Sequence, residues 1–294
     1  DHTLVRKYAE KTGLSLVLGF LGLNSDSLTE KENNSLNFKI GKDGIEKYYN
    51  DILKGEPGVK ILETDSLGNL VSDHTKEVAR NGKRIDMTVD SKVNAKFGEI
   101  VKQVVEDRGF KGGTGIIMDV KNGEILAITN FPEYESEVLS SGLDKSLINS
   151  YLKDNRNFFL NRAAAGVYAP GSVLKPLIAL AALNENIISP NKVLLTHGSI
   201  SIPNPYGGSP TIFKDWKNHG EVDMYRALAV SSDVYFYTVG GGYAGIKGLG
   251  ISKIKQYAEM FNLNKKTGID ILGEKEGVIP SPELKEKTNP ENPV

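Results

Sequence analysis

The chain has 294 residues, and its 36 basic and 37 acidic side chains leave a net charge of −1 at neutral pH. No overall positive field therefore favours a nucleic-acid partner. The absence of cysteine excludes disulfides, thiol catalysis and cysteine-based metal sites. The four histidines lack the i, i+4 spacing of paired ligands, so the sequence offers little for a zinc site or a Ser-His-Asp triad. The length predicts two domains.

The first part of the chain, residues 1–84, is polar and rich in turns. Its longest apolar stretch, residues 14–23, is too short to span a membrane and contains two glycines, so it predicts a strand or a buried segment. Residues 59–64 and 70–71 are strand-like and lie on either side of a turn. We interpret this part as a small strand-rich module.

A single short amphipathic helix is predicted over residues 41–50, appended to that module. Glu46 and Lys47 fall on this helix. Charged side chains in such a pattern normally face water, so we predict a solvated face for both. No residue pattern in this part of the chain indicates catalysis.

Residues 85–109 predict a strand followed by a long helix. Residues 85–89 are strand-like, and from Ser91 apolar residues recur at helical spacing until Gly109 ends the pattern. The predicted apolar face of this helix contains Val93, Phe97, Ile100, Val101, Val104 and Val105.

A β-hairpin is predicted next, because the apolar runs 114–120 and 124–131 flank Asn122-Gly123, a pair that favours a tight turn. The long helix and this hairpin indicate the beginning of a mixed α and β domain. Further helices are predicted over residues 224–230 and 254–261. The glycine-rich residues 240–250 follow a helix rather than a strand, which argues against a nucleotide-binding loop.

The segment around Ser172 and Lys175 carries the first chemical signal. Pro170-Gly171 predicts a turn, and serine is a good residue with which to begin a helix. Pro176 fits only the first turn of a helix, so the helix should begin near Ser172. Two residues three apart on a helix share a face, which brings a hydroxyl and an amine together. The alternative without catalysis is a serine that caps the helix, followed by a solvated lysine. Residues 177–183 are all Leu, Ile or Ala, so we predict a helix buried on every side.

A second signal is Ser231-x-Asp233, which with Ser172-x-x-Lys175 approaches the paired boxes of penicillin-binding serine enzymes. Longer motifs follow the same order, and these are residues 41–58, 115–132, 161–176, 213–220, 231–237 and 265–274. On these motifs the chain resembles the class B penicillin-binding proteins over nearly its whole length. It is most similar to the elongation-type penicillin-binding protein 2 group of peptidoglycan D,D-transpeptidases.

The resemblance implies an α+β fold in two parts. Residues 1–84 would form a dimerisation or pedestal module. Residues 85–294 would form a penicillin-recognising serine transpeptidase domain, with an antiparallel sheet, helices packed on it and an all-helical subdomain. In that domain Ser172 would be the nucleophile that forms an acyl-enzyme, and Lys175 would be its general base. Ser231 would relay a proton, and Asp233, where the family more often has Asn, would orient the lysine and the substrate amide.

The resemblance also implies partners and location. The substrates would be peptidoglycan stem peptides ending in D-Ala-D-Ala, β-lactams would act as inhibitors, and no cofactor or metal would be needed. A membrane glycosyltransferase and the cell-elongation machinery would bind the N-terminal module, on the extracytoplasmic face of the cell membrane. The membrane anchor is absent from this chain, and we expect the family's sequence to continue beyond both of its ends.

Lys266-Thr267-Gly268 spells the family's third box, but it follows a predicted helix and precedes residues that match a different family segment. We therefore reject it as catalytic and expect the true box beyond Val294. The hairpin would then show an unpaired edge and a bare apolar face, and the chain alone would be inactive.

Two other functions remain open. The same fold could serve as a β-lactam sensor or scaffold that stays acylated. A β-lactamase would need a deacylating base near Ser172, and no glutamate in family context stands out. Locally, Ser231 could cap a turn and Asp233 could form an Asx hydrogen bond. Asp215 and Trp216 resemble a groove-side loop of the family, although the tryptophan could equally be a packing residue.

Overall fold

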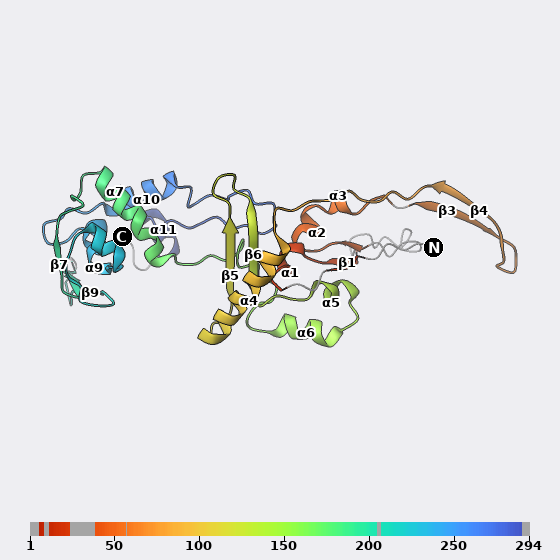
Figure 1. Cartoon of the computed structure of the whole chain (residues 1–294), viewed down its shortest axis with the longest axis horizontal. Helices are drawn as coiled ribbons and strands as arrows, with labels where there is room; N and C mark the ends of the chain where they lie inside the picture. Colours follow the sequence, from red (N-terminus) through yellow and green to blue (C-terminus); the bar gives the residue numbers. More distant parts are fainter. Residues whose placement is uncertain (1–5, 9–11, 24–38, 57, 205–206, 290–294) are drawn as a thin grey trace. The chain divides into compact units, whose positions relative to one another are not determined.

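A computed structural model describes residues 6–8, 12–23, 39–56, 58–204 and 207–289. The chain divides into two compact units, whose elements are drawn in Figure 1. Unit 1 comprises Asp1–Gly166 and Gly268–Lys275, and unit 2 comprises Val167–Thr267 and Glu276–Val294. The strands that the described residues form all pair antiparallel, in two-stranded sheets. The predicted α+β class with antiparallel strands is confirmed.

Unit 1 combines short N-terminal elements with a long helix and a hairpin. Its helices are α1 (Ser15–Leu18), α2 (Gly44–Tyr48), α3 (Asn50–Leu53), α4 (Ser91–Arg108), α5 (Ser136–Ser141) and α6 (Lys145–Lys153). Its strands are β1 (Leu21–Leu23), β2 (Lys39–Gly41), β3 (Val59–Thr64), β4 (Leu70–Glu77), β5 (Gly113–Met118) and β6 (Ile125–Phe131). Val17, Ile45, Ile128 and Ile271 meet in one buried cluster, so segments distant in sequence share this core. Within the predicted buried or strand segment 14–23, Leu16 and Val17 are both 1% exposed and residues 21–23 form β1, where Leu23 is exposed.

The region of the predicted 41–50 helix differs from expectation in two ways. Two short helices, α2 and α3, replace one, and Asp43 caps the first by accepting from Gly44 N at 2.9 Å. The predicted solvated face is wrong for Glu46, which is 7% exposed, and right for Lys47, which is exposed. Arg6 explains the burial, since its Nε lies 2.8 Å from Glu46 Oε1.

The strand predicted over residues 85–89 is wrong. This segment runs beside β6 without forming a ladder, and it is tied there by two bonds. Thr88 Oγ1 donates to Ile125 O at 2.7 Å, and Asp90 N donates to Leu126 O at 2.9 Å. One of the two bonds uses a side chain, so the alternation of a ladder is absent.

Helix α4 ends at Gly109 in the left-handed conformation, as predicted, but its contact face differs from the predicted apolar stripe. Of the predicted stripe, Val105 is buried and Phe97 and Val101 are half-buried, whereas Val93, Ile100 and Val104 are 44–49% exposed. Asn94 and Gly98 are buried as well. Asn94 donates to Gly13 O at 3.1 Å and accepts from Ile128 N at 2.7 Å, so a satisfied amide joins the apolar residues on this face.

The predicted hairpin is formed by β5 and β6, paired from Gly113↔Phe131 to Met118↔Ile125, and α4 packs against it (Figure 1). Ile116, Ile117 and Met118 are 37–50% exposed. Among the described residues β5 pairs with β6 alone. The expected bare apolar face and unpaired edge are both present.

Unit 2 contains the 3₁₀ turn η1 (Gly171–Leu174), the helices α7 (Lys175–Asn184), α8 (Met224–Ala229), α9 (Asp233–Gly241), α10 (Gly250–Met260) and α11 (Pro282–Thr288), and the strands β7 (Leu194–Thr196), β8 (Ser199–Ile202), β9 (Thr211–Lys214) and β10 (Gly220–Val222). Helices α7, α9 and α10 contact one another around a core that includes Ala182, Tyr235 and Val239. No helix within the described ranges combines the length and the hydropathy that crossing a bilayer requires.

Helix α7 is not buried on every side as predicted. Ala179, Ala181 and Ala182 face the core, whereas Leu180 and Leu183 are 49% and 39% exposed. When a helix is apolar on every side, its sequence does not indicate which face packs against the core. The contacts of the small alanines with the core decide the orientation instead.

Candidate active site

Ser172 lies on η1, the tight turn that precedes α7. Gly171 has a φ of +60°, which glycine adopts readily, and Ser172 O accepts the 3₁₀-type bond from Lys175 N. Pro176 occupies the first turn of α7, where its missing N–H removes no helical bond. The predicted helix start is therefore confirmed, with the refinement that a 3₁₀ turn carries the serine.

Ser231 lies in the sharp link between α8 and α9. Ser231 N donates to Leu228 O at 3.2 Å and Ser232 N donates to Ala227 O at 2.9 Å, the paired bonds of a Schellman helix end. The left-handed position in that ending usually holds glycine, and here Ser231 occupies it with a φ of +53°. Ser232 then caps α9, accepting from Tyr235 N at 3.3 Å. One turn thus ends one helix, begins the next and presents both Ser231 and Asp233.

The structure brings the four predicted site residues together. Lys175 Nζ donates to Ser231 O at 2.7 Å, to Ser231 Oγ at 3.0 Å and to Asp233 Oδ1 at 2.6 Å. Ser231 Oγ in turn donates to Ser172 Oγ at 3.0 Å. A continuous hydrogen-bonded path therefore runs from Ser172 through Ser231 to Lys175 and Asp233.

This path fixes what the group can do chemically. The Lys175 side chain is only 12% exposed, and the Phe236 ring lies 5.8 Å from its Nζ. All three donors of an ammonium are used by the contacts to Ser231 and Asp233. A neutral amine at the same place would have a lone pair free to accept a proton from the Ser231 hydroxyl. Because hydroxyl groups rotate, the same atoms can pass a proton from Ser172 towards Lys175.

The sequence placed Asp215 in a groove-side loop through the family resemblance but assigned it no role in the site. Its side chain is fully buried, and its Oδ2 accepts from Ser232 Oγ at 2.8 Å and from Val234 N at 2.9 Å. Burial alone would raise the pKa of this carboxyl, but the hydrogen bonds, that of Val234 first, outweigh burial and leave the pKa below its usual range. The only signal in the sequence was its place in residues 213–220.

Trp216 adjoins the same turn but is not a core residue, since it is 65% exposed. Its Nε1 donates to Ser231 O at 3.3 Å, and its ring meets the edge of His219 at 4.9 Å. The interpretation of Trp216 as a buried packing residue is therefore wrong. The side chain borders Ser231 and leaves most of its surface open to solvent.

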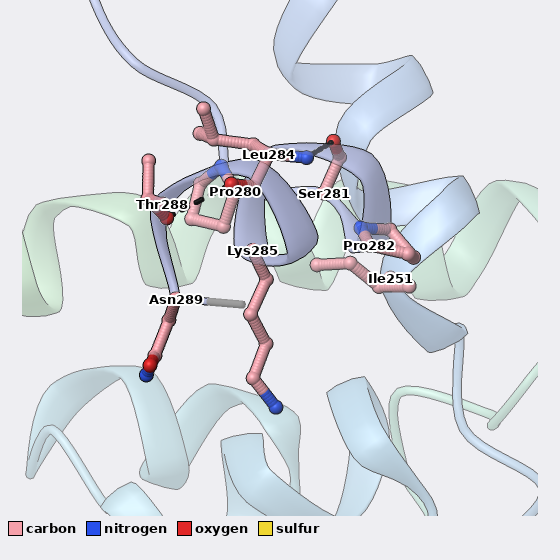
Figure 2. Close-up of a pocket in the computed structure, with 8 residues that line it drawn as sticks. All are labelled: Ile251, Pro280, Ser281, Pro282, Leu284, Lys285, Thr288 and Asn289. Carbon is pink, nitrogen blue, oxygen red and sulfur yellow. Dashed lines mark hydrogen bonds between the residues drawn. The ribbon is translucent and has the colours of Figure 1, made fainter. Parts of the chain in front are cut away.

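Two other features lie apart from this group. Lys266, Thr267 and Gly268 follow α10 and belong to no strand in the part of the chain that the structure describes, as expected for a segment that is not the third box. A pocket of about 480 Å³ lies between Ile251 and the residues of α11 (Figure 2). Its lining includes none of the four site residues. Among the described residues no three His, Asp or Glu side chains gather as metal ligands would.

Comparison with known proteins places the chain in a family. The model of the penicillin binding protein transpeptidase domain matches residues 113–289, and that of the penicillin-binding protein dimerisation domain matches residues 1–87. The chain belongs to the penicillin-binding protein transpeptidase family. This confirms the resemblance stated from the sequence motifs.

Named relatives agree with this assignment. The chain is 32% identical to the peptidoglycan D,D-transpeptidase MrdA of Haemophilus influenzae, covering 96% of this chain and 42% of that protein. It is 28% identical to MrdA of Escherichia coli, covering 96% and 43%. The chain therefore spans about two fifths of the length of these relatives. The complex of PBP2 with MreC from Helicobacter pylori matches with a TM-score of 0.74 at 28% identity, covering 98% of this chain and 51% of that one.

Proposed function

We propose that this protein is a serine D,D-transpeptidase that cross-links peptidoglycan stem peptides through an acyl-enzyme on Ser172. The observation that carries the proposal is the unbroken hydrogen-bonded path from Ser172 through Ser231 to Lys175 and Asp233. A nucleophile in contact with a relay and an amine is the arrangement that acyl transfer by serine needs. The MrdA relatives, which are named D,D-transpeptidases, support the same reaction.

The reaction begins with attack of Ser172 Oγ on the carbonyl carbon of the penultimate D-Ala. The Oγ–C bond forms, and the hydroxyl proton moves through Ser231 Oγ to the neutral amine of Lys175. Collapse breaks the C–N bond, and the proton returns along the same path to the amine of the departing D-Ala. The backbone N–H of Ser172 can serve as one donor to the developing oxyanion.

Transfer reverses these roles. An amine of a second stem peptide attacks the ester on Ser172 and gives up a proton to Lys175, and Ser172 leaves with a proton returned through Ser231. Asp233, at 2.6 Å from Lys175 Nζ, holds the amine in place throughout. A β-lactam would acylate Ser172 by the same attack, with ring opening in place of amine departure.

The proposal assigns residues 1–84 to docking and residues 85–294 to catalysis, on the extracytoplasmic face of the cell membrane. MreC is the partner in the similar Helicobacter pylori complex, which supports a partner of the cell-elongation machinery here. A membrane glycosyltransferase is the second proposed partner. No cofactor or metal is required by the steps above.

Covalent labelling tests the proposal. The full-length gene product should be labelled by a fluorescent penicillin, with the label on the peptide that contains Ser172, and Ser172→Ala should abolish it. Ser201→Ala, an exposed serine of β8, is the matched control and should label as the parent does. An unlabelled parent, or labelling of Ser172→Ala equal to the parent, would rule out the mechanism.

A second measurement separates transpeptidation from its rivals. A stem pentapeptide donor and a D-amino acid acceptor should give the exchanged peptide by mass spectrometry. A sensor or scaffold would be labelled by penicillin and give no exchange. A β-lactamase would release the label rapidly.

A further inference from the structure

The turn that carries Ser231 is held in a conformation that its own sequence does not favour. A non-glycine residue in the left-handed region costs about 1–2 kcal/mol, and such strain persists only where the surroundings enforce it. Ser231 has a φ of +53°, with α8 ending at one side of it and α9 beginning at the other. Some contact outside these two helices must stabilise the link.

We propose that Asp215 is a positioning residue for the Ser172 site, whose buried carboxylate holds the Ser232–Val234 backbone and thereby fixes Ser231 between Ser172 and Lys175. This inference rests on the proposed function, since it explains how the acylation geometry is maintained. Asp215 is not placed in contact with the reacting atoms. Its effect on them runs through the turn.

The contacts of Asp215 support this role. Its Oδ2 accepts from Ser232 Oγ at 2.8 Å and from Val234 N at 2.9 Å, so one oxygen ties together the cap and the second residue of α9. The carboxylate thus supplies an acceptor for N–H groups that a helix start leaves without a partner. Ser231 is the residue immediately before this tied segment, so its position follows from that of Ser232.

A second contact from the same loop reaches Ser231 directly. Trp216 Nε1 donates to Ser231 O at 3.3 Å, and the same carbonyl accepts from Lys175 Nζ at 2.7 Å. The loop that begins at Asp215 therefore contacts the turn at two points: Trp216 binds the Ser231 carbonyl, and Asp215 binds Ser232 and Val234. With the carbonyl held, the Ser231 hydroxyl points to Ser172 and Lys175, as its 3.0 Å contacts to both require.

The charged and titratable side chains around the Asp215–Ser231 turn are Asp233, Lys175, His219 and Tyr237. Asp233 faces Lys175 directly, while His219 Nε2 lies 3.4 Å from Asp215 Oδ1 on the side away from the cap contacts. The charges of Asp233 and Asp215 add to burial in raising the pKa of Tyr237. The lowered pKa of Asp215 agrees with a carboxylate that stays ionised while it accepts these bonds.

The test measures the acylation rate constant with a fluorescent penicillin in the full-length gene product. Asp215→Ala should lower it about tenfold or more, the effect expected on losing hydrogen bonds to a charged acceptor. Asp215→Asn keeps an acceptor oxygen for Val234 N and should recover most of the rate. The matched control is Asp223→Ala, which removes the cap of α8 at its other end, where Asp223 accepts from Arg226 N at 2.8 Å. That variant should acylate within about twofold of the parent, since distant sites act independently.

A double-mutant cycle distinguishes positioning from general support. If Asp215 acts through the Ser231 hydroxyl, Asp215→Ala should change the rate less than about twofold in a Ser231→Ala background. An equal loss in both backgrounds, no rescue by Asp215→Asn, or a parent rate for Asp215→Ala would each overturn the inference. If Asp215→Ala does not fold, Asp215→Ser, which removes the carboxylate but keeps a small polar side chain, replaces it in the two backgrounds and decides by the same criterion. A parent that penicillin does not label at Ser172 would overturn the proposed function, and this inference with it.

Discussion

Glu46 in unit 1 and Asp215 in unit 2 are both buried carboxylates, but they have different kinds of partner. Glu46 forms an ion pair with Arg6, whose side chain is 38% exposed. Burial outweighs that pair and raises the pKa of Glu46. Asp215 accepts hydrogen bonds from Val234 N and Ser232 Oγ, and these outweigh burial and lower its pKa. The hydrogen bonds to Asp215 together outweigh its burial, whereas the partners of Glu46 do not outweigh its burial.

The two units use their buried carboxylates differently. In unit 1 Glu46 lies on α2 and pairs with Arg6. In unit 2 the bonds of Asp215 determine the geometry of a turn whose neighbours, Ser231 and Asp233, contact Lys175. Four experiments test whether the two units differ in this way.

The largest effect is expected from removing the amine. Lys175→Ala should lower the acylation rate about 10²–10⁴-fold, the usual contribution of a general base. Arg6→Ala, which removes the partner of the buried Glu46 carboxylate, should leave the acylation rate near that of the parent. Instead it should lower the free energy of unfolding by on the order of 1 kcal/mol. Penicillin labelling kinetics and urea unfolding measure the two quantities. Equal losses of acylation in both variants would show that Lys175 has no special role in acylation.

The second effect has opposite signs for stability and activity. Ser231→Gly relieves a left-handed serine and should raise the free energy of unfolding by about 1 kcal/mol. The same change removes the hydroxyl between Ser172 and Lys175, so acylation should slow by about 10²-fold or more.

Ser231→Ala is the matched control for that experiment. It should slow acylation as much as the glycine variant but gain no stability, because alanine keeps the strain. A glycine variant no more stable than the alanine variant would mean that the turn is not strained.

Much of the molecule follows from local sequence signals. The end of α4 at Gly109, the hairpin at Asn122-Gly123 and the helix start at Ser172 each depend on neighbouring residues. The pairing of Ser172-x-x-Lys175 with Ser231-x-Asp233 was predicted from the resemblance to penicillin-binding serine enzymes, since neither short motif alone indicates its partner.

The features that were missed depend on distant partners. Glu46 looks like a surface residue until Arg6, forty positions earlier, is placed beside it. The segment 85–89 has a strand-like pattern but forms no ladder within the described residues, and Thr88 and the following Asp90 each donate one bond to β6. Asp215 lies in a polar loop, and its importance comes from Ser232 and Val234, which are themselves organised by the end of α8. Burial of a polar side chain is decided by tertiary contacts, so composition alone misassigns it.

The third experiment compares how the stability contributions of Glu46 and Asp215 change with pH. The raised pKa of Glu46 means that its contribution to stability is complete below its unfolded pKa, near 4.3, and is lost as pH rises through the folded pKa. The lowered pKa of Asp215 gives the reverse, a contribution present above about pH 4 and lost as pH falls through the folded pKa. Urea unfolding of the parent, Glu46→Gln and Asp215→Asn from pH 3 to 7 measures both contributions.

The expected result is a pair of opposite slopes. Relative to Glu46→Gln, the parent should lose stability as pH rises above about 4. Relative to Asp215→Asn, the parent should gain stability as pH rises from about 3 to 5. Slopes of the same sign would show that the two carboxylates are not held differently.

The smallest effect is expected on the exposed hairpin of unit 1. Lys60 and Asp73 form an ion pair across β3 and β4, with side chains 52% and 45% exposed. Solvent screens such a pair, so Asp73→Ala should change the free energy of unfolding by less than about 0.5 kcal/mol and should not affect acylation. Measurements at low and high salt check the cause, because the small difference should vanish as salt rises. A larger loss of unfolding free energy would mean that the exposed Lys60–Asp73 pair stabilises the protein as much as the buried bonds of Asp215 do. Burial would then not explain the difference between the two kinds of polar group.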